Sequence, residues 1–222
     1  MSIVSNNVWI YTAVITWWQH SGKTTWQPYI KKYFSDIWFD VHCCPEWARE
    51  IISKVWIPGI DIPVIDFQYL ITEKQFELEK EYRQRALDAF LETKKQKNQL
   101  IVLDRWLLDT KAFLTQSEFD ILAQKYSLDL QGIFTKGKYY DVIINLETSA
   151  IGTNVYTTDE ARKEDKEQAI TNQNKIKEVY ASFNNGQWAI FIDNSTWFEA
   201  KMYRASAAVA KELGMTLLPF TL

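Results

Sequence analysis

Long apolar runs, a strong charge of one sign and a set of cysteines are all missing from this chain of 222 residues. No apolar stretch approaches the roughly 20 residues that span a bilayer, and the N-terminus lacks the basic start of a signal peptide. The net charge of −3 provides no broad basic surface, so we expect no binding to nucleic acid. These absences predict a cytoplasmic protein without a transmembrane segment.

The only two cysteines, Cys43 and Cys44, are adjacent in the sequence. Neighbouring cysteines rarely form a disulfide with each other, and two thiols are too few for a metal cluster. We therefore expect a reduced pair at the end of a buried strand.

Glycine is scarce, whereas tryptophan is abundant. The chain has 7 glycines and 10 tryptophans, and together they come to about the number that glycine alone normally supplies. This imbalance bears on the loop described below, in which tryptophan stands where glycine is expected.

Apolar segments alternate with segments of helical period along the whole chain. Such alternation is typical of an α/β protein with a doubly wound parallel sheet flanked by helices. The expected strands are 8–16, 37–44, 100–103, 140–146 and 188–192. The expected helices are 23–33, 46–54, 66–97, 107–126 with a break near 116, 157–183 and 197–213.

A phosphate-binding pattern follows the first expected strand, in Trp17-Trp18-Gln19-His20-Ser21-Gly22-Lys23-Thr24-Thr25. The pattern G-x-x-x-x-G-K-[ST] is matched at every fixed position except the first, which is occupied by Trp17. In such a loop Lys23 reaches the β- and γ-phosphates and the Thr24 hydroxyl binds Mg²⁺. We predict that residues 17–25 bind ATP or GTP together with Mg²⁺. The alternative is an accidental Gly-Lys-Thr on a surface turn.

Asp104 and Arg105 follow the third expected strand. P-loop NTPases carry an acidic residue at such a strand end, where it holds the magnesium shell. We therefore predict that Asp104 binds Mg²⁺ or polarises an acceptor hydroxyl, and that Arg105 neutralises the transferring phosphate. The alternative is an ion pair that caps the strand end.

Glu46 follows the second expected strand, and Arg49 lies about one helical turn further along. A carboxylate at this position can accept a proton from the hydroxyl of a phosphate acceptor. Arg49 would share its helix face and either pair with Glu46 or bind substrate. The alternative is a surface helix with a favourable acidic residue in its first turn.

Two later segments are candidates for completing a nucleotide site. The charged stretch 156–166 contains Arg162, which we expect to close over phosphates as part of a lid, although charge runs are also typical of solvated helix faces. Asn194 follows the fifth expected strand and could read a nucleotide base, or its turn could cap the last helix. We assign residues 1–222 to one domain with a lid at about 148–183.

These stretches together resemble the AAA-type P-loop domain shared by NadR-like ribosylnicotinamide kinases and the TRPL-translocation-defect proteins. The resemblance covers nearly the whole chain, and its matching stretches are 15–25, 45–50, 103–110, 140–146 and 192–196. It implies the P-loop NTPase fold, nucleotide and metal binding by Lys23 and Thr24, and a lid that contains Arg162. It also implies an acceptor site at Glu46 and Arg49, to which we add Asp109.

The departures from the family pattern are all of one kind: tryptophan stands where glycine is typical. The positions are Trp17, Trp18, Trp56 and Trp106. An indole at Trp17 conflicts with a tight turn that lets the backbone approach phosphate. One hypothesis is that UGA codons for glycine have been translated as tryptophan, as the meaning of UGA differs among bacterial lineages. The other is a degenerate loop that binds nucleotide weakly.

The sequence thus predicts a Mg²⁺-dependent phosphotransferase that acts on the hydroxyl of a small, nucleoside-like metabolite. Members of the family also include GTP-binding regulators, so the alternative is a nucleotide-dependent switch or binding module without a small-molecule acceptor. The expected partners are a nucleotide and a small acceptor. The choice between ATP and GTP, the acceptor and the oligomeric state stay open.

Overall fold

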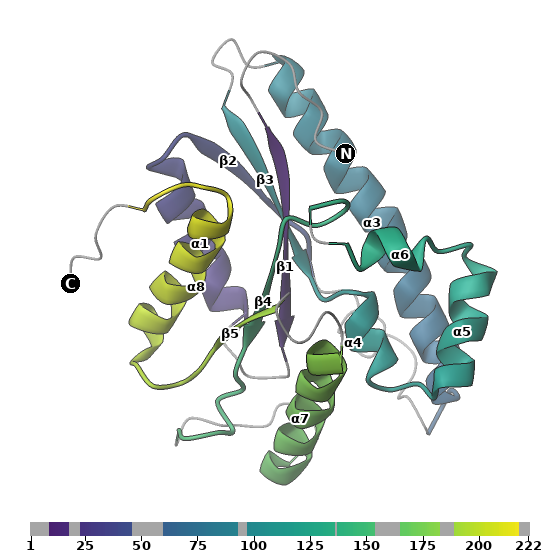
Figure 1. Ribbon diagram of the computed structural model, residues 1–222. Coiled ribbons are helices and arrows are strands. Elements are labelled where there is room, and N and C mark those ends of the chain that lie inside the picture. Colours follow the sequence, from purple (N-terminus) through teal and green to yellow (C-terminus); the bar gives the residue numbers. More distant parts are fainter. Residues whose placement is uncertain are drawn as a thin grey trace.

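The computed structural model describes residues 9–17, 23–45, 60–92, 97–135, 137–153, 165–182 and 189–217 (Figure 1). The strands are β1 (Ile10–Trp17), β2 (Phe39–Cys43), β3 (Asn98–Asp104), β4 (Val142–Leu146) and β5 (Ala189–Ile192). The helices are α1 (Lys23–Ser35), α3 (Val64–Glu92), α4 (Leu107–Lys111), α5 (Gln116–Lys125), α6 (Leu130–Ile133), α7 (Lys166–Ser182) and α8 (Phe198–Glu212). Within these ranges, no helix has both the length and the apolar character needed to cross a membrane.

The five strands form one parallel sheet in the order β2-β3-β1-β4-β5, which confirms the predicted fold class. The first strand lies at the centre, between β3 and β4. Its last residues are in register with the last residues of both neighbours, since Ile15 lies opposite Asp104 and Trp17 lies opposite Leu146. The polar segments that follow these strands therefore begin at one edge of the sheet.

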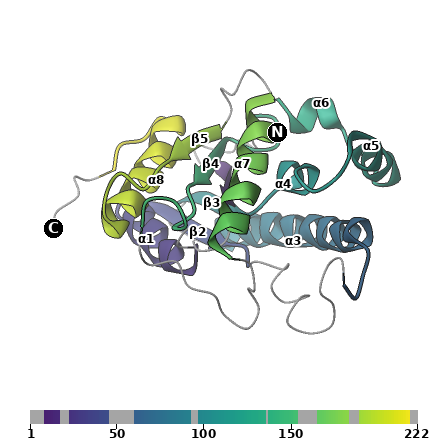
Figure 2. The same cartoon turned by 90° about the horizontal axis from the view of Figure 1, so that it is seen from below.

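Helices cover both faces of the sheet, with α1 and α8 on one side and α3, α4 and α7 on the other (Figures 1 and 2). Alternate residues of each strand point to opposite faces, which explains why the strand sequences are apolar almost throughout. Ala13 and Ile15 pack against Trp26 of α1 and Met202 of α8. Val14 belongs to the other core, with side chains of α3, α4 and α7.

The segment 107–126, predicted as a helix broken near 116, contains the two helices α4 and α5. The second helix begins at Gln116 because Thr115 caps it. The backbone N–H of Glu118 donates to the Thr115 hydroxyl, and the backbone N–H of Thr115 donates to the Glu118 carboxylate. These reciprocal bonds satisfy two donors that a continuous helix would have used internally. The predicted helix 46–54 lies outside the described residues.

Helix α7 occupies nearly half of the segment that was assigned to a lid. It packs against α4, and its side chains Ala169, Gln173, Ile176 and Tyr180 are buried. The Gln173 side chain donates to Asn145 of β4 and accepts from the backbone N–H of Thr148. Residues 166–182 therefore belong to the body of the fold. The lid, with Arg162, remains a prediction for the preceding segment, where 154–164 lie outside the described residues.

Trp38 occupies the turn between α1 and β2 in a backbone conformation that favours glycine. Its φ is 66°, in the left-handed region, and 62% of its surface is exposed. The left-handed region costs an L-residue roughly 1–2 kcal/mol, and an exposed ring recovers little of that by burial. This is the conformational signature expected where tryptophan replaces glycine.

Candidate functional site

The end of β1 and the start of α1 frame the predicted phosphate loop. The strand ends at Trp17 and the helix begins at Lys23, so the order strand, loop and helix is the one the pattern requires. The structure describes the backbone of Trp17, Lys23, Thr24 and Thr25. The intervening residues Trp18, Gln19, His20, Ser21 and Gly22 lie outside the described residues.

Asp104 and Arg105 lie beside this end of β1, as the sequence predicted for the third strand. Asp104 is the residue of β3 paired with Ile15, and the backbone N–H of Arg105 donates to the Ile15 carbonyl at 3.0 Å. Asp104 is half-buried, and its partner Ile15 lies two residues before Trp17 in β1. Such a carboxylate can serve a cation bound at the loop.

Arg105 adopts a left-handed backbone conformation, with φ of 73°. This conformation costs about 1–2 kcal/mol for an L-residue and persists only where the surroundings fix it. Two hydrogen bonds do so: its N–H donates to Ile15, and its carbonyl accepts from the Gln75 side chain of α3. Gln75 was not among the predicted site residues, because nothing in its helical period distinguishes it from its neighbours.

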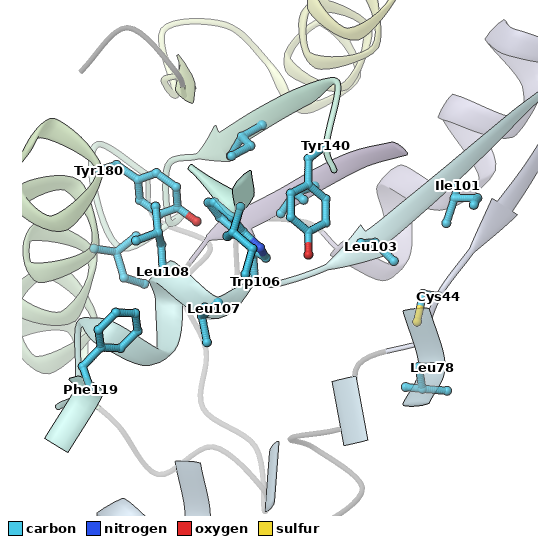
Figure 3. Close-up of a cluster of buried hydrophobic side chains, with 14 of the residues drawn as sticks. Cys44, Leu78, Ile101, Leu103, Trp106, Leu107, Leu108, Phe119, Tyr140 and Tyr180 are labelled. Atoms are coloured by element: carbon cyan, nitrogen blue, oxygen red, sulfur yellow. The ribbon is translucent and has the colours of Figure 1, made fainter. Parts of the chain in front are cut away.

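Trp106 lies in the hydrophobic core on the side of the sheet covered by α3, α4 and α7, together with Tyr140 and Tyr180 (Figure 3). Only 1% of its surface is exposed, and its ring meets Tyr140 edge-on at a centroid distance of 4.9 Å. Phe134 and Tyr180 lie against other parts of the indole, at 5.9 and 6.4 Å. The backbone of Trp106 is extended, with φ of −152° and ψ of 171°, so glycine is not needed there. The expectation that position 106 favours glycine finds no support in this conformation.

Asp109, predicted to contact substrate, forms internal hydrogen bonds in this structure, and its contact with substrate stays a prediction. Its carboxyl group is only 3% exposed, and burial raises its pKa while the hydrogen bond from Thr16 opposes that rise. One oxygen accepts from the hydroxyls of Thr16 and Tyr180, the latter at 3.1 Å, and the other accepts from the Trp106 N–H at 3.1 Å. Asp109 thus joins the end of β1 to α4 and α7.

The Asn194 side chain, predicted to read a nucleotide base, also forms internal hydrogen bonds, and the predicted role stays a prediction. Its side-chain amide donates to the carbonyls of Thr148 and Ile151, both at 2.8 Å, and its side-chain oxygen accepts from Lys201 at 2.7 Å. The backbone N–H of Asn194 donates to the Glu147 carboxylate at 3.0 Å. Through these bonds Asn194 joins the segment that follows β4 to the segment that follows β5.

Lys201 of α8 also holds these two segments together. Its position in a charged helix gave no sign in the sequence that it would be buried. It is buried, and its ammonium donates to the Glu147 carbonyl at 2.6 Å. Burial lowers the pKa of Lys201 to about 8, while the charges of Glu147 and Asp193 act in the opposite direction. The folded protein therefore holds a cation there at neutral pH at a cost in stability.

Replacing Lys201 with methionine should change how stability depends on pH. Since the pKa in the folded state, about 8, lies below the ordinary value of 10.5, the folded state loses this proton at lower pH than the unfolded chain. The wild type should therefore gain about 2 kcal/mol relative to Lys201→Met between pH 7 and 9.5. Urea denaturation at both pH values measures the difference, with Lys211→Met on the same helix as control. A constant difference across this range would contradict the assignment.

The adjacent cysteines are free thiols at the end of β2, as predicted. Cys44 is buried and Cys43 is half-buried. Burial raises the pKa of Cys43 to about 11, and burial together with the charges of Asp104 and Glu79 raises that of Cys44 to about 12. Both groups are therefore protonated and weakly nucleophilic at neutral pH.

Besides the five residues of the phosphate loop, three further predicted site residues lie outside the part of the chain that the structure describes. Glu46 and Arg49, assigned to the acceptor, lie outside the described residues, as does Arg162 of the predicted lid. Cys44 and Pro45 precede Glu46, and the Cys44 N–H donates to the Val102 carbonyl of β3 at 2.8 Å. The chain thus enters the predicted acceptor segment beside the strand that ends in Asp104.

Comparison with solved structures finds the same fold in a NadR protein and in two kinases. A NadR protein in complex with NR matches with a TM-score of 0.63 and 14% identity, over 96% of this chain and 54% of that one. Thymidylate kinase from Ehrlichia chaffeensis matches with a TM-score of 0.52 and 15% identity, over 92% and 98%. Deoxyadenosine kinase from M. mycoides with bound dATP matches with a TM-score of 0.54 and 12% identity, over 92% and 99%. The chain spans about half the length of the NadR protein.

Comparison at the level of sequence families gives the assignment. A search of curated proteins returned no match. The family profile described as an AAA domain matches residues 19–199, which is most of the chain and includes the phosphate loop from its third residue onward. With the parallel sheet and the framed loop, this match shows that the chain belongs to the AAA domain family of P-loop proteins.

Proposed function

We propose that this protein transfers the terminal phosphoryl group of ATP to the hydroxyl of a small, nucleoside-like metabolite, with Mg²⁺. The observation that carries the proposal is the position of Asp104, paired with Ile15 where β1 enters the phosphate-loop pattern. Two of the structurally similar proteins are a thymidylate kinase and a deoxyadenosine kinase, and a third is in complex with NR. These likenesses support a small acceptor over a protein acceptor.

The chemistry asked of the protein is mostly positioning and neutralisation of charge. The acceptor oxygen forms a bond to the γ-phosphorus as the bond to the β,γ-bridging oxygen breaks, and ADP carries the electrons of that bond away. Glu46 orients the acceptor hydroxyl and takes its proton. Lys23, Arg105 and Arg162 balance the charge on the transferring phosphoryl oxygens.

The residues available for a metal fit Mg²⁺, which prefers oxygen ligands. The Thr24 hydroxyl and the Asp104 carboxylate are such donors, and Asp104 is placed beside the end of β1. A bound Mg²⁺ would neutralise charge on the β- and γ-phosphates. Arg105, fixed by Ile15 and Gln75, keeps Asp104 at the strand end by holding the following peptide in place.

The proposal is tested by assaying transfer of labelled phosphate from ATP to a panel of nucleosides. The wild type and a Trp17→Gly/Trp18→Gly variant are both assayed, and the second should turn over at least one nucleoside faster. In that background, Asp104→Asn should lower kcat by about 100-fold or more, because the metal loses a charged ligand. Asp120→Asn on exposed α5 is the matched control and should leave kcat unchanged.

Two outcomes would overturn the proposal. Equal activity of Asp104→Asn and Asp120→Asn would remove Asp104 from the site. Binding of ATP or GTP without phosphate transfer to any nucleoside or related metabolite would favour the nucleotide-dependent switch.

A further inference from the structure

A cavity lies between α3 and residues of the stretches 127–133 and 139–140. Its volume is about 600 Å³, and it reaches Ile10, the first residue of β1. The phosphate-loop pattern begins at the other end of that strand, about 23 Å away for seven residues at about 3.3 Å each. Tyr140 lines the cavity and is in edge-on contact with Trp106 of the core. The cavity lining includes none of the residues assigned to the proposed phosphoryl transfer.

A buried carboxyl group, that of Glu79 on α3, forms part of the cavity wall. Only 7% of Glu79 is exposed, and the Tyr140 hydroxyl lies 3.1 and 3.0 Å from its two oxygens. One hydroxyl supplies one hydrogen, whereas a carboxylate can accept about four hydrogen bonds. Burial raises the pKa of Glu79 to about 7, while the charge of Arg83 and the hydrogen bond from Tyr140 act in the opposite direction, so a further N–H donor would add to the stabilisation of the carboxylate. The cavity wall is thus suited to a donor on a ligand.

Two positively charged side chains of α3, Arg83 and Lys80, also line the cavity. The first is fixed in place, since its guanidinium donates to the Thr12 hydroxyl at 3.1 Å and the Tyr139 carbonyl at 2.9 Å. The second is exposed at the rim, next to Glu79 in sequence. An anionic group on a ligand would be stabilised there without leaving water completely.

Aromatic surface completes the cavity. The Tyr139 ring lines it and is 41% exposed, and Phe76 faces it from α3. The remaining acidic group at the rim, Asp129, is already engaged, because it accepts from Lys138 at 2.8 Å and from the Gly132 N–H at 2.9 Å. The Lys138 ammonium lies over the Tyr139 ring at 5.7 Å from its centroid, and a planar ring on a ligand would pack against the remaining exposed surface of Tyr139.

We propose that this cavity binds a small aromatic amine that carries an anionic group. The amine donates to Glu79, the ring packs on Tyr139, and the anion lies beside Lys80. A volume of about 600 Å³ falls in the range of small-molecule sites in proteins. This site is independent of the proposed phosphoryl transfer, and its occupation requires neither ATP nor Mg²⁺.

The probe is 4-aminobenzoate, titrated at pH 8 into the full chain and followed by backbone amide shifts in NMR spectra. Benzoate lacks the donor and aniline lacks the anion, so each should bind about tenfold more weakly, the cost of one good hydrogen bond or charge contact. Saturating ATP with Mg²⁺ should leave the affinity unchanged. Benzoate binding as tightly as 4-aminobenzoate, or displacement of the probe by ATP, would overturn the proposal.

Variants at exposed positions test the site without endangering the fold. Lys80→Ala and Tyr139→Ala should each weaken binding of 4-aminobenzoate by about fivefold to tenfold. Glu79→Gln should remove the preference for 4-aminobenzoate over benzoate. Lys74→Ala, on the same helix but outside the cavity lining, is the matched control and should bind as the wild type does. Equal affinities of Lys80→Ala, Tyr139→Ala and the control would overturn the proposal even if Glu79→Gln fails to fold.

Discussion

Replacing Trp106 with glycine is expected to lower the free energy of unfolding by about 4 kcal/mol. The indole is 1% exposed and packs against Phe134, Tyr140 and Tyr180, so its removal leaves a large cavity in the core. Truncating a buried tryptophan typically costs about 3–5 kcal/mol, and glycine adds backbone entropy to the unfolded chain. Urea denaturation of the wild type and Trp106→Gly measures the loss.

The matched control is Trp38→Gly, for which the opposite sign is expected. Trp38 is largely exposed and has a positive φ, so glycine should raise the free energy of unfolding by about 1 kcal/mol. If Trp106→Gly instead proves as stable as the wild type, the core would be built around glycine there. That result would support translation of a glycine codon as tryptophan at position 106.

Replacing both Trp17 and Trp18 with glycine is expected to raise the affinity for ATP by about 100-fold. Glycine at the first position of the pattern allows the tight turn that brings backbone N–H groups onto phosphate. Two hydrogen bonds from N–H groups to a charged phosphate, at about 1.5 kcal/mol each, account for a gain of this size. Isothermal titration with ATP and Mg²⁺ measures both proteins.

Adding Lys23→Ala to the double variant is the control, since it removes the cation that contacts the β- and γ-phosphates and should abolish the gain. Equal affinities of the wild type and the double variant would show that the loop functions with tryptophan. The coding DNA provides a separate test, because UGG codons at Trp17, Trp18 and Trp106 would exclude the misreading of UGA.

The sequence allowed the ends of the strands to be placed because two signals coincide there. An almost continuous apolar run marks a strand buried on both faces, and the polar residue that ends it marks the edge of the sheet. Asp104 was located in this way, and the register with Ile15 confirms its place at the end of β3. The break before Gln116 was readable for a similar reason, because Thr115 and Glu118 form a capping box through local contacts.

The sequence alone could not tell which polar residues at these ends face a ligand. Asp109 and Asn194 have the residue types and positions of ligand-binding groups. Both form hydrogen bonds with residues distant in sequence: Asp109 accepts from Tyr180, and Asn194 donates to Thr148. Lys201 and Glu79 read as ordinary charged positions of amphipathic helices and turn out to be buried. Burial of a polar group depends on what packs over it, which is a property of the assembled layers.

The sequence by itself determined the class of fold, the strand–loop–helix order at Lys23 and the position of the Asp104 carboxylate at the end of β3, since periodicity and strand-end chemistry are local. Only the tertiary structure decided which tryptophan conforms to a glycine position and which fills the core. Trp38 and Trp106 are the same residue type, but one is exposed with a positive φ and the other is extended and enclosed by three rings. Backbone conformation and enclosure arise when α1, α4 and α7 pack onto the sheet, and no local pattern encodes them.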